Sequence, residues 1–224
     1  MGNFLLGRSL LQSIATIMVA VGVLFASITA SAEPMQPEAL INKLFADVNE
    51  RLKKDAPLIE KDRNHIVTVA EEMVEPFVSF DKMAKQILGK HWKKITKDQR
   101  ARYIAAFKNR ISVAMVSRYD PSIEYGLTVT GSRLNDKGNI AQVKSEVVEK
   151  NSGQKYMIDY KLFTTPKSDR WQVYDVIVEG VSVLQSYKTA SAEEITRNGI
   201  EHLIAQLEAA PAEDSQASEY KVME

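Results

Sequence analysis

The spacing of apolar residues changes near Asp120 and Pro121, about midway along this 224-residue chain. Before that point apolar residues recur every three to four positions, which is the spacing of an amphipathic helix. After it they alternate with polar residues, as in a β-strand with one buried face. Helical spacing returns from Val183 to the end of the last apolar run. Helices, then strands, then helices predict an α+β domain.

The first helical block carries clear boundary signals. The sequence predicts a first helix over 37–54 and a second that begins at Pro57, because proline suits the first turn of a helix. Pro76 should end or kink the second helix. Ser79 is a candidate N-cap and Gly89 a candidate C-cap of a short third helix.

A long helix and two closing helices complete the helical part. Thr96 and Gln99 have the spacing of a capping box, which predicts the start of the long helix. Gly199 should separate the last two helices.

The strand block predicts four antiparallel strands joined by short polar turns. A strongly twisted sheet of this kind, wrapped by helices, can enclose a conical space. The expected strands lie near 122–132, 139–150, 155–165 and 170–180.

Apolar side chains gather on one face of each of these elements. On the last strand Tyr174, Val176 and Val178 should share the apolar face, with Asp175 on the other. Periodicity does not distinguish a filled core from a lined cavity, so both interpretations stay open. The candidate residues are Met83, Ile87, Phe107, Ile111, Met115, Val143, Val147, Tyr156, Ile158, Tyr160, Leu162, Tyr174, Val176 and Val178.

Composition argues against several function classes. The chain has 29 basic and 29 acidic residues, whereas nucleic-acid binding needs a basic field. It has no cysteine, which excludes thiolate metal sites, cysteine nucleophiles and disulfides. The three histidines lack metal-ligand spacing, and no metal or cofactor is predicted. Asp175 is the one candidate for acid–base chemistry, and a structural role is the favoured interpretation of it.

The N-terminus has the pattern of an export signal. An apolar run over 10–28 follows Arg8 and precedes the small residues 30–32, which predicts a signal peptide cleaved after Ala32. An uncleaved membrane anchor is the alternative. Residues 33–210 would then form a single domain, and the small, polar residues 211–224 are expected to be a disordered tail.

The densest basic cluster is 90–94, together with Lys97. It suits contact with anionic lipid headgroups or with an acidic partner surface. An ordinary solvated helix end is the alternative.

Five stretches that together cover most of 77–207 carry distinctive motifs. They are Phe77-Val78-Ser79-Phe80-Asp81-Lys82-Met83-Ala84, Ile87-Leu88-Gly89-Lys90-His91-Trp92, Thr96-Lys97-Asp98-Gln99-Arg100, Trp171-Gln172-Val173-Tyr174-Asp175-Val176-Ile177-Val178-Glu179-Gly180-Val181-Ser182 and Gly199-Ile200-Glu201-His202-Leu203-Ile204-Ala205-Gln206-Leu207. The E-G-V-S element that follows W-x-x-x-D is the most specific of these motifs. In this order and spacing, the stretches resemble the MlaC (toluene-tolerance) family.

The resemblance implies a fold like nuclear transport factor 2, with phospholipid tails held between sheet and helices by the candidate residues given above. It implies a monomeric periplasmic carrier, not an enzyme, whose cargo is phospholipid. The implied partners are an inner-membrane ABC transporter with an MCE-domain subunit and an outer-membrane lipoprotein–porin complex. Ser191 stands where relatives often have a large residue, which would open the cavity mouth. A periplasmic adaptor without ligand, or a small-molecule enzyme on the same scaffold, is the alternative.

Overall fold

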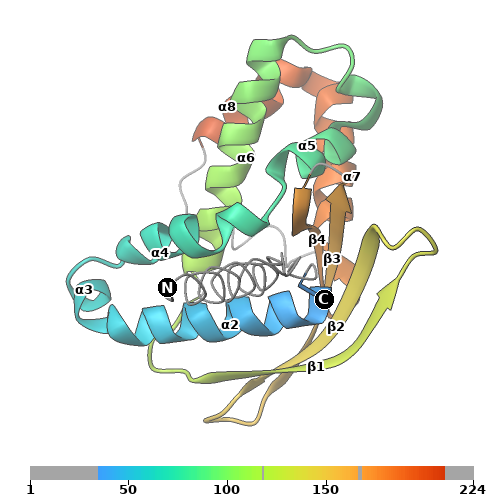
Figure 1. Ribbon diagram of the computed structural model, residues 1–224. Coiled ribbons are helices and arrows are strands. Elements are labelled where there is room, and N and C mark those ends of the chain that lie inside the picture. The colour runs from blue at the N-terminus through green and yellow to red at the C-terminus, as the bar shows by residue number, and fades with distance from the viewer. Residues whose placement is uncertain (1–34, 118, 166–167, 210–224) are drawn as a thin grey trace, which may run out of the picture. The chain divides into compact units, whose positions relative to one another are not determined.

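The computed structural model describes residues 35–117, 119–165 and 168–209, with the backbone alone at 115–117 and 168–169 (Figure 1). The signal peptide expected at 1–32 and the tail expected at 211–224 lie outside the described residues. Both therefore stay predictions.

The helices bracket the strands in the chain, as the change of period predicts. They are α2 (Pro37–Lys54), α3 (Ala56–Lys61), α4 (His65–Met73), α5 (Phe80–Leu88), α6 (Lys97–Ser117), α7 (Val183–Asn198) and α8 (Ile200–Ala209), with two 3-10 turns, η1 (Glu75–Phe77) and η2 (Gly89–His91).

Local signals place several boundaries correctly. The first helix has the predicted bounds. The capping box is formed: the Gln99 backbone N–H donates to Thr96 Oγ1 at 3.1 Å, and the Thr96 N–H donates to Gln99 Oε1 at 2.8 Å. Gly89 and Gly199 end α5 and α7 with φ of 49° and 85°, a conformation that glycine adopts without a side-chain clash.

One helical prediction was wrong, and a second was confirmed in position only. The expected second helix is interrupted after α3, where Asp62 Oδ1 accepts a hydrogen bond from the Asn64 N–H and forms a local turn before α4. Ser79 occupies the N-cap position of α5 without a side-chain cap bond. Its backbone N–H instead donates to Val173 O at 2.9 Å, which joins this helix to the sheet.

The sheet is an antiparallel meander in chain order. The expected number of four strands was wrong, because a fifth follows the tight turn at Glu179 and Gly180, where φ is 49° and 82°. This fifth strand has only two residues, too few to show the alternation by which a strand is recognised in the sequence. The strands are β1 (Tyr125–Leu134), β2 (Ile140–Glu149), β3 (Lys155–Thr165), β4 (Ser168–Val178) and β5 (Val181–Ser182).

The prediction that Tyr174 shares a face with Val176 and Val178 was wrong, because β4 contains a bulge. Lys161 pairs with Asp175, but the next residue, Leu162, pairs with Val173, so Tyr174 is an extra residue in β4. Val176 keeps the predicted face, whereas the Tyr174 ring packs edge-on against Phe163 at 5.9 Å. Tyr174 is therefore not on the face that Val176 and Val178 share.

Buried apolar residues form three clusters in the described part of the chain. The first, the helical cluster, lies between α5, α6, α7 and α8, with Phe107 at 0% exposure. The second, the sheet cluster, joins Leu40 and Ile41 of α2 to the sheet. The third links α2, α3 and α4 around Val69. Figure 1 shows the corresponding division, with α5 to α8 above and α2 to α4 beside the sheet.

Tyr103 is fully buried in the helical cluster, and its hydroxyl has no hydrogen-bond partner of good geometry. Burial raises the pKa of Tyr103 to about 12, and the nearby Ser191 hydroxyl partly offsets this rise. Ser191 is itself buried at 3% exposure in α7, so it lies within the helical packing rather than at a cavity mouth.

We expect Tyr103→Phe to raise the free energy of unfolding by up to about 1 kcal/mol, because it removes a buried polar group without losing a bond. Urea denaturation would measure the change. The control is Tyr156→Phe, since the Tyr156 hydroxyl donates a hydrogen bond to Glu149 Oε1 at 2.8 Å, and this variant should lose stability. A loss in both variants would show that the Tyr103 hydroxyl is satisfied in solution.

Candidate functional site

One face of the sheet, called the inner face below, collects most of the candidate residues. Cross-strand pairing places Val143 of β2 opposite Tyr160 of β3, which in turn faces Val176 of β4. Because side chains of directly paired residues point to the same side of a sheet, these three form a row across the strands. Parallel rows extend the face, and the candidate residues on it are Val143, Val147, Tyr156, Ile158, Tyr160, Leu162, Val176 and Val178.

The inner face has a filled part and a more open part. Near the β1–β2 turn, Val143 and Leu162 are fully buried in the sheet cluster with α2. Toward the other end, Tyr156, Ile158 and Val178 are partly exposed and belong to none of the three clusters of described residues. Apolar side chains that do not fill a core are available to contact an apolar ligand.

Two polar groups are built into the inner face. Ser145 lies in the middle of β2 at 0% exposure, and its hydroxyl donates to Ile158 O at 2.8 Å. Burial raises the pKa of Tyr160, and the nearby Ser145 hydroxyl partly offsets this rise. Both groups are neutral at physiological pH, so the face carries no charge at its centre.

The more open part ends in a polar rim. The Tyr156 hydroxyl donates to Glu149 Oε1 at 2.8 Å, and this bond is the main cause of the raised pKa of Tyr156. The ring of Tyr156 therefore presents an apolar body to the face, while its polar tip is held at the strand end.

The structure does not bring the helical candidates onto the inner face. Met83, Ile87 and Phe107 are fully buried in the helical cluster, and Ile111 packs against it. The Phe107 ring stacks on Tyr103 and meets Phe80 and Tyr187 edge-on, at centroid distances of 5.0 to 6.4 Å. The Met115 side chain lies outside the described residues.

Tyr174 belongs with the opposite, outer face. There the Lys82 ammonium lies 4.0 Å from the Phe163 ring centroid and 5.0 Å from that of Tyr174. Desolvation by burial, followed by repulsion from Lys85, lowers the pKa of Lys82.

Sequence reasoning missed two inner-face residues on β1. Leu127 pairs with Val147, and Val129 pairs with Ser145, so both point to the inner face and pack against the sheet cluster. The period-2 pattern of 125–129 carries this signal. The bulge between Val129 and Gly131 then shifts the phase of the rest of β1.

Asp175 is a structural residue rather than an acid–base group in a cavity. It is 2% exposed, and both its carboxylate oxygens accept from the Ser182 hydroxyl, at 2.8 and 3.0 Å. The Leu184 backbone N–H donates to it at 3.0 Å, and Lys161 Nζ lies 3.2 Å away. These bonds tie the start of α7 to β4.

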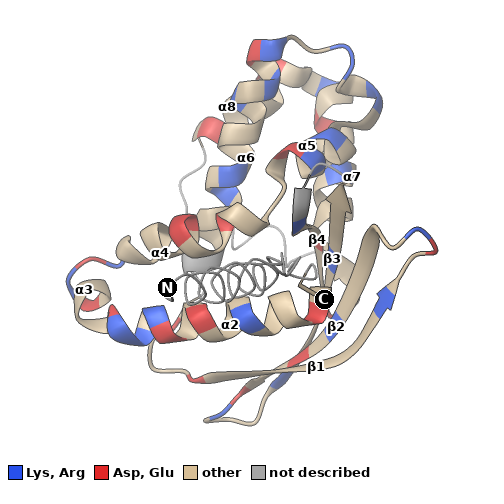
Figure 2. Ribbon diagram, viewed as in Figure 1, with Lys and Arg blue, Asp and Glu red and all other residues tan. Residues whose placement is uncertain are grey.

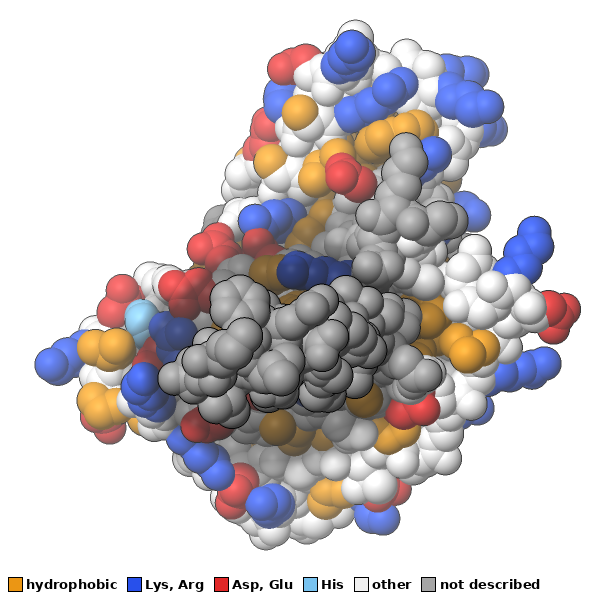
Figure 3. All heavy atoms as spheres, in the orientation of Figure 1, with side chains coloured by type: hydrophobic (Ala, Val, Ile, Leu, Met, Phe, Trp, Pro, Cys, Tyr) orange, Lys and Arg blue, Asp and Glu red, His pale blue; other side chains and the backbone are white. Residues whose placement is uncertain are grey.

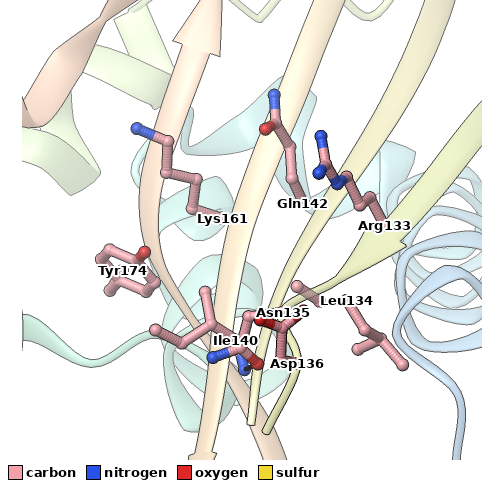
Figure 4. Close-up of a pocket in the computed structure, with 9 residues that line it drawn as sticks. Arg133, Leu134, Asn135, Asp136, Ile140, Gln142, Lys161 and Tyr174 are labelled. Carbon is pink, nitrogen blue, oxygen red and sulfur yellow. Dashed lines mark hydrogen bonds between the residues drawn. The ribbon is translucent and has the colours of Figure 1, made fainter. Parts of the chain in front are cut away.

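A shallow depression of about 450 Å³ lies on the outer face near the β1–β2 turn. Figure 4 shows Arg133, Gln142 and Lys161 projecting from three neighbouring strands beside Tyr174. Its lining includes the charged residues Arg133, Asp136 and Lys161, which distinguishes it from the inner face. Among the residues that the structure describes, no group of three or more His, Asp or Glu is arranged to hold a metal ion.

None of the helices within the described ranges is long and apolar enough to cross a membrane.

The family model described as MlaC protein matches residues 42–209 of this chain. The chain belongs to the MlaC family. The match includes the sheet, the inner face and all helices from within α2 to α8.

Two curated relatives agree with membership of the MlaC family. The intermembrane phospholipid transport system binding protein MlaC of Haemophilus influenzae is 21% identical over 167 residues, which cover 75% of this chain and 76% of that protein. The toluene tolerance protein ttg2D of Pseudomonas putida is 25% identical over 179 residues, covering 78% and 79% respectively.

A solved structure shares the fold. It is a phospholipid-binding protein from Ralstonia solanacearum in complex with a phospholipid, with a TM-score of 0.69 and 21% identity. The alignment covers 79% of this chain and 95% of that one.

Proposed function

We propose that this chain is a phospholipid carrier whose inner face contacts the acyl chains of its cargo. The partly exposed apolar residues of the inner face carry this proposal. Membership of the MlaC family and the names of the relatives support it. The nuclear transport factor 2-like assignment of the scaffold belongs to the same proposal.

The energetics of transfer suit a carrier. Withdrawing two acyl chains of about 30 methylenes in all from water releases on the order of 24 kcal/mol, at roughly 0.8 kcal/mol per methylene. A bilayer offers nearly the same gain, so exchange between membrane and protein is close to balanced. The direction of phospholipid transport would then be set by partner proteins, since the sequence has no Gly-rich phosphate loop with which to bind a nucleotide.

Location and partners follow from family membership as parts of the proposal. The chain would act in the periplasm after cleavage at Ala32. It would exchange phospholipid between an outer-membrane lipoprotein–porin complex and an inner-membrane ABC transporter with an MCE-domain subunit.

Mass spectrometry of an organic extract from the natively purified protein tests the proposal. We expect phospholipid in roughly stoichiometric amount. A protein that carries no lipid and takes none from vesicles would instead be an adaptor whose inner face is closed by packing.

A further inference from the structure

The turn between α5 and α6 presents a concentrated positive charge on a chain that is otherwise balanced. Between residues 82 and 100 there are seven basic residues, and Asp98 is the one acidic residue. The whole chain carries equal numbers of both signs. Figure 2 shows Lys and Arg positions in blue along this end of the ribbon, and Figure 3 shows blue side chains gathered over the same end.

Five of these residues are exposed lysines without an ion-pair partner in the described part of the chain. We call them the lysine surface. The remaining basic residues in this stretch have roles inside the fold, as Lys82 does over the aromatic pair described above. The lysine surface consists of Lys85, Lys90, Lys93, Lys94 and Lys97.

A rigid framework holds the lysine surface. Ile95 is buried in the helical cluster, and Trp92 packs against it. The Arg100 guanidinium lies 5.1 Å from the Trp92 ring centroid and donates to Trp92 O at 3.1 Å. The capping box fixes the first turn of α6. The backbone under the lysines is thus ordered before any partner arrives, which reduces the entropy lost on binding.

Acidic groups of the neighbouring helix do not neutralise this charge. Glu201 and Glu208 of α8 form ion pairs with Arg102, at 3.0 and 2.8 Å, and Glu201 also accepts from Gln99. Arg102 offsets one of these two negative charges within the α6–α8 contact, and the single negative charge that remains is small beside the five lysines.

The chemistry of the lysine surface favours a membrane over a protein partner. Specific protein interfaces have a desolvated core of large apolar or aromatic residues, and they favour arginine, which binds carboxylates with two hydrogen bonds. None of the strongly exposed large apolar side chains lies in 85–97. Lysine is a compact point charge on a flexible stem, suited to diffuse attraction by many headgroups.

We infer that the lysine surface docks the protein on membranes that expose anionic phospholipid headgroups. Docking of this kind brings the protein to a bilayer without depending on a bound lipid, so it stands apart from the proposed carrier function. Attraction to the surface weakens within a Debye length, which makes the contact reversible and sensitive to salt.

Vesicle co-sedimentation tests this inference with the protein as purified from the expressing cell. One set of vesicles is phosphatidylcholine alone, and the other contains about 30% phosphatidylglycerol, whose charge attracts lysine. The test variant is K90Q/K93Q/K94Q/K97Q. The control variant removes four exposed lysines that also lack an ion-pair partner among the described residues, K54Q/K61Q/K137Q/K144Q.

We expect the wild type and the control variant to bind the anionic vesicles and to release them at high salt. The test variant should bind at least about tenfold more weakly, since each lysine near the surface contributes separately. Equal binding by the test and control variants would overturn the inference. So would a wild type that binds neither set of vesicles, and that result would leave an acidic protein as the partner of the lysine surface.

Discussion

Replacement of Val176 by glutamate is expected to abolish phospholipid retention while leaving a folded domain. Val176 lies on the inner face beside Tyr160, where its side chain packs against the sheet cluster but stays partly exposed. A carboxylate at this position keeps its water when the face is empty, but must lose it when acyl chains cover the face. Burying an unpaired charge costs several kcal/mol, enough to displace the cargo.

The measurement is phospholipid per protein in an organic extract, together with circular dichroism and thermal unfolding. Met157→Glu is the matched control, because Met157 neighbours Ile158 on β3, faces the opposite side and is 44% exposed. This control should retain its lipid. Full retention in a folded Val176→Glu protein would refute the assignment of the inner face, whether or not the chain binds lipid elsewhere.

Replacement of Asp175 by alanine should lower the free energy of unfolding by about 3 kcal/mol, because it removes an acceptor of several charge-assisted bonds. The buried Leu184 N–H would lose its partner, and Ser182 would lose its anchor to β4. Chemical denaturation would measure the loss. The control is Asp159→Ala, whose carboxylate is partly exposed and accepts from Gln142 at 2.7 Å; we expect a loss of less than about 1 kcal/mol.

Asp175→Asn separates structure from catalysis. If Asp175 were a catalytic acid on this scaffold, the folded Asn variant would keep its lipid and lose a turnover. A stability equal to that of the wild type in Asp175→Ala would contradict the structural role derived from its hydrogen bonds.

Local signals predicted the start of α6 and the ends of α5 and α7, because a cap depends on residues within one turn. The broad order of helices and strands followed from the change of apolar period at Asp120. The inner-face rows on β2 and β3 were also predictable. Regular alternation along an antiparallel pair of strands gives the pair one apolar face and one polar face.

The bulge at Tyr174 was not predictable in the same way. Residues 171–178 are largely apolar on both sides, because the sheet cluster covers one side of β4 and α7 covers the other. With little alternation between apolar and polar residues, the sequence gives no sign of an inserted residue.

The faces of the helices were hard to assign for a different reason. The stripe of Phe107 and Ile111 indicated burial correctly, but periodicity does not say which element covers a helix. The structure puts that stripe against α5, α7 and α8 rather than over the sheet.

The division of the buried residues into three clusters has a consequence for cooperativity. Much of the chain's apolar packing lies in the helical cluster, away from the inner face. A fluctuation that separates α2 to α4 from the sheet disrupts the second cluster, whereas the third cluster, within α2 to α4, and the packing of α5 to α8 are kept. Such sub-global opening costs less than global unfolding. The fold therefore contains a separable unit beside its candidate site. Exposing the inner face requires only the free energy of opening that unit, which is less than the free energy of unfolding the whole domain.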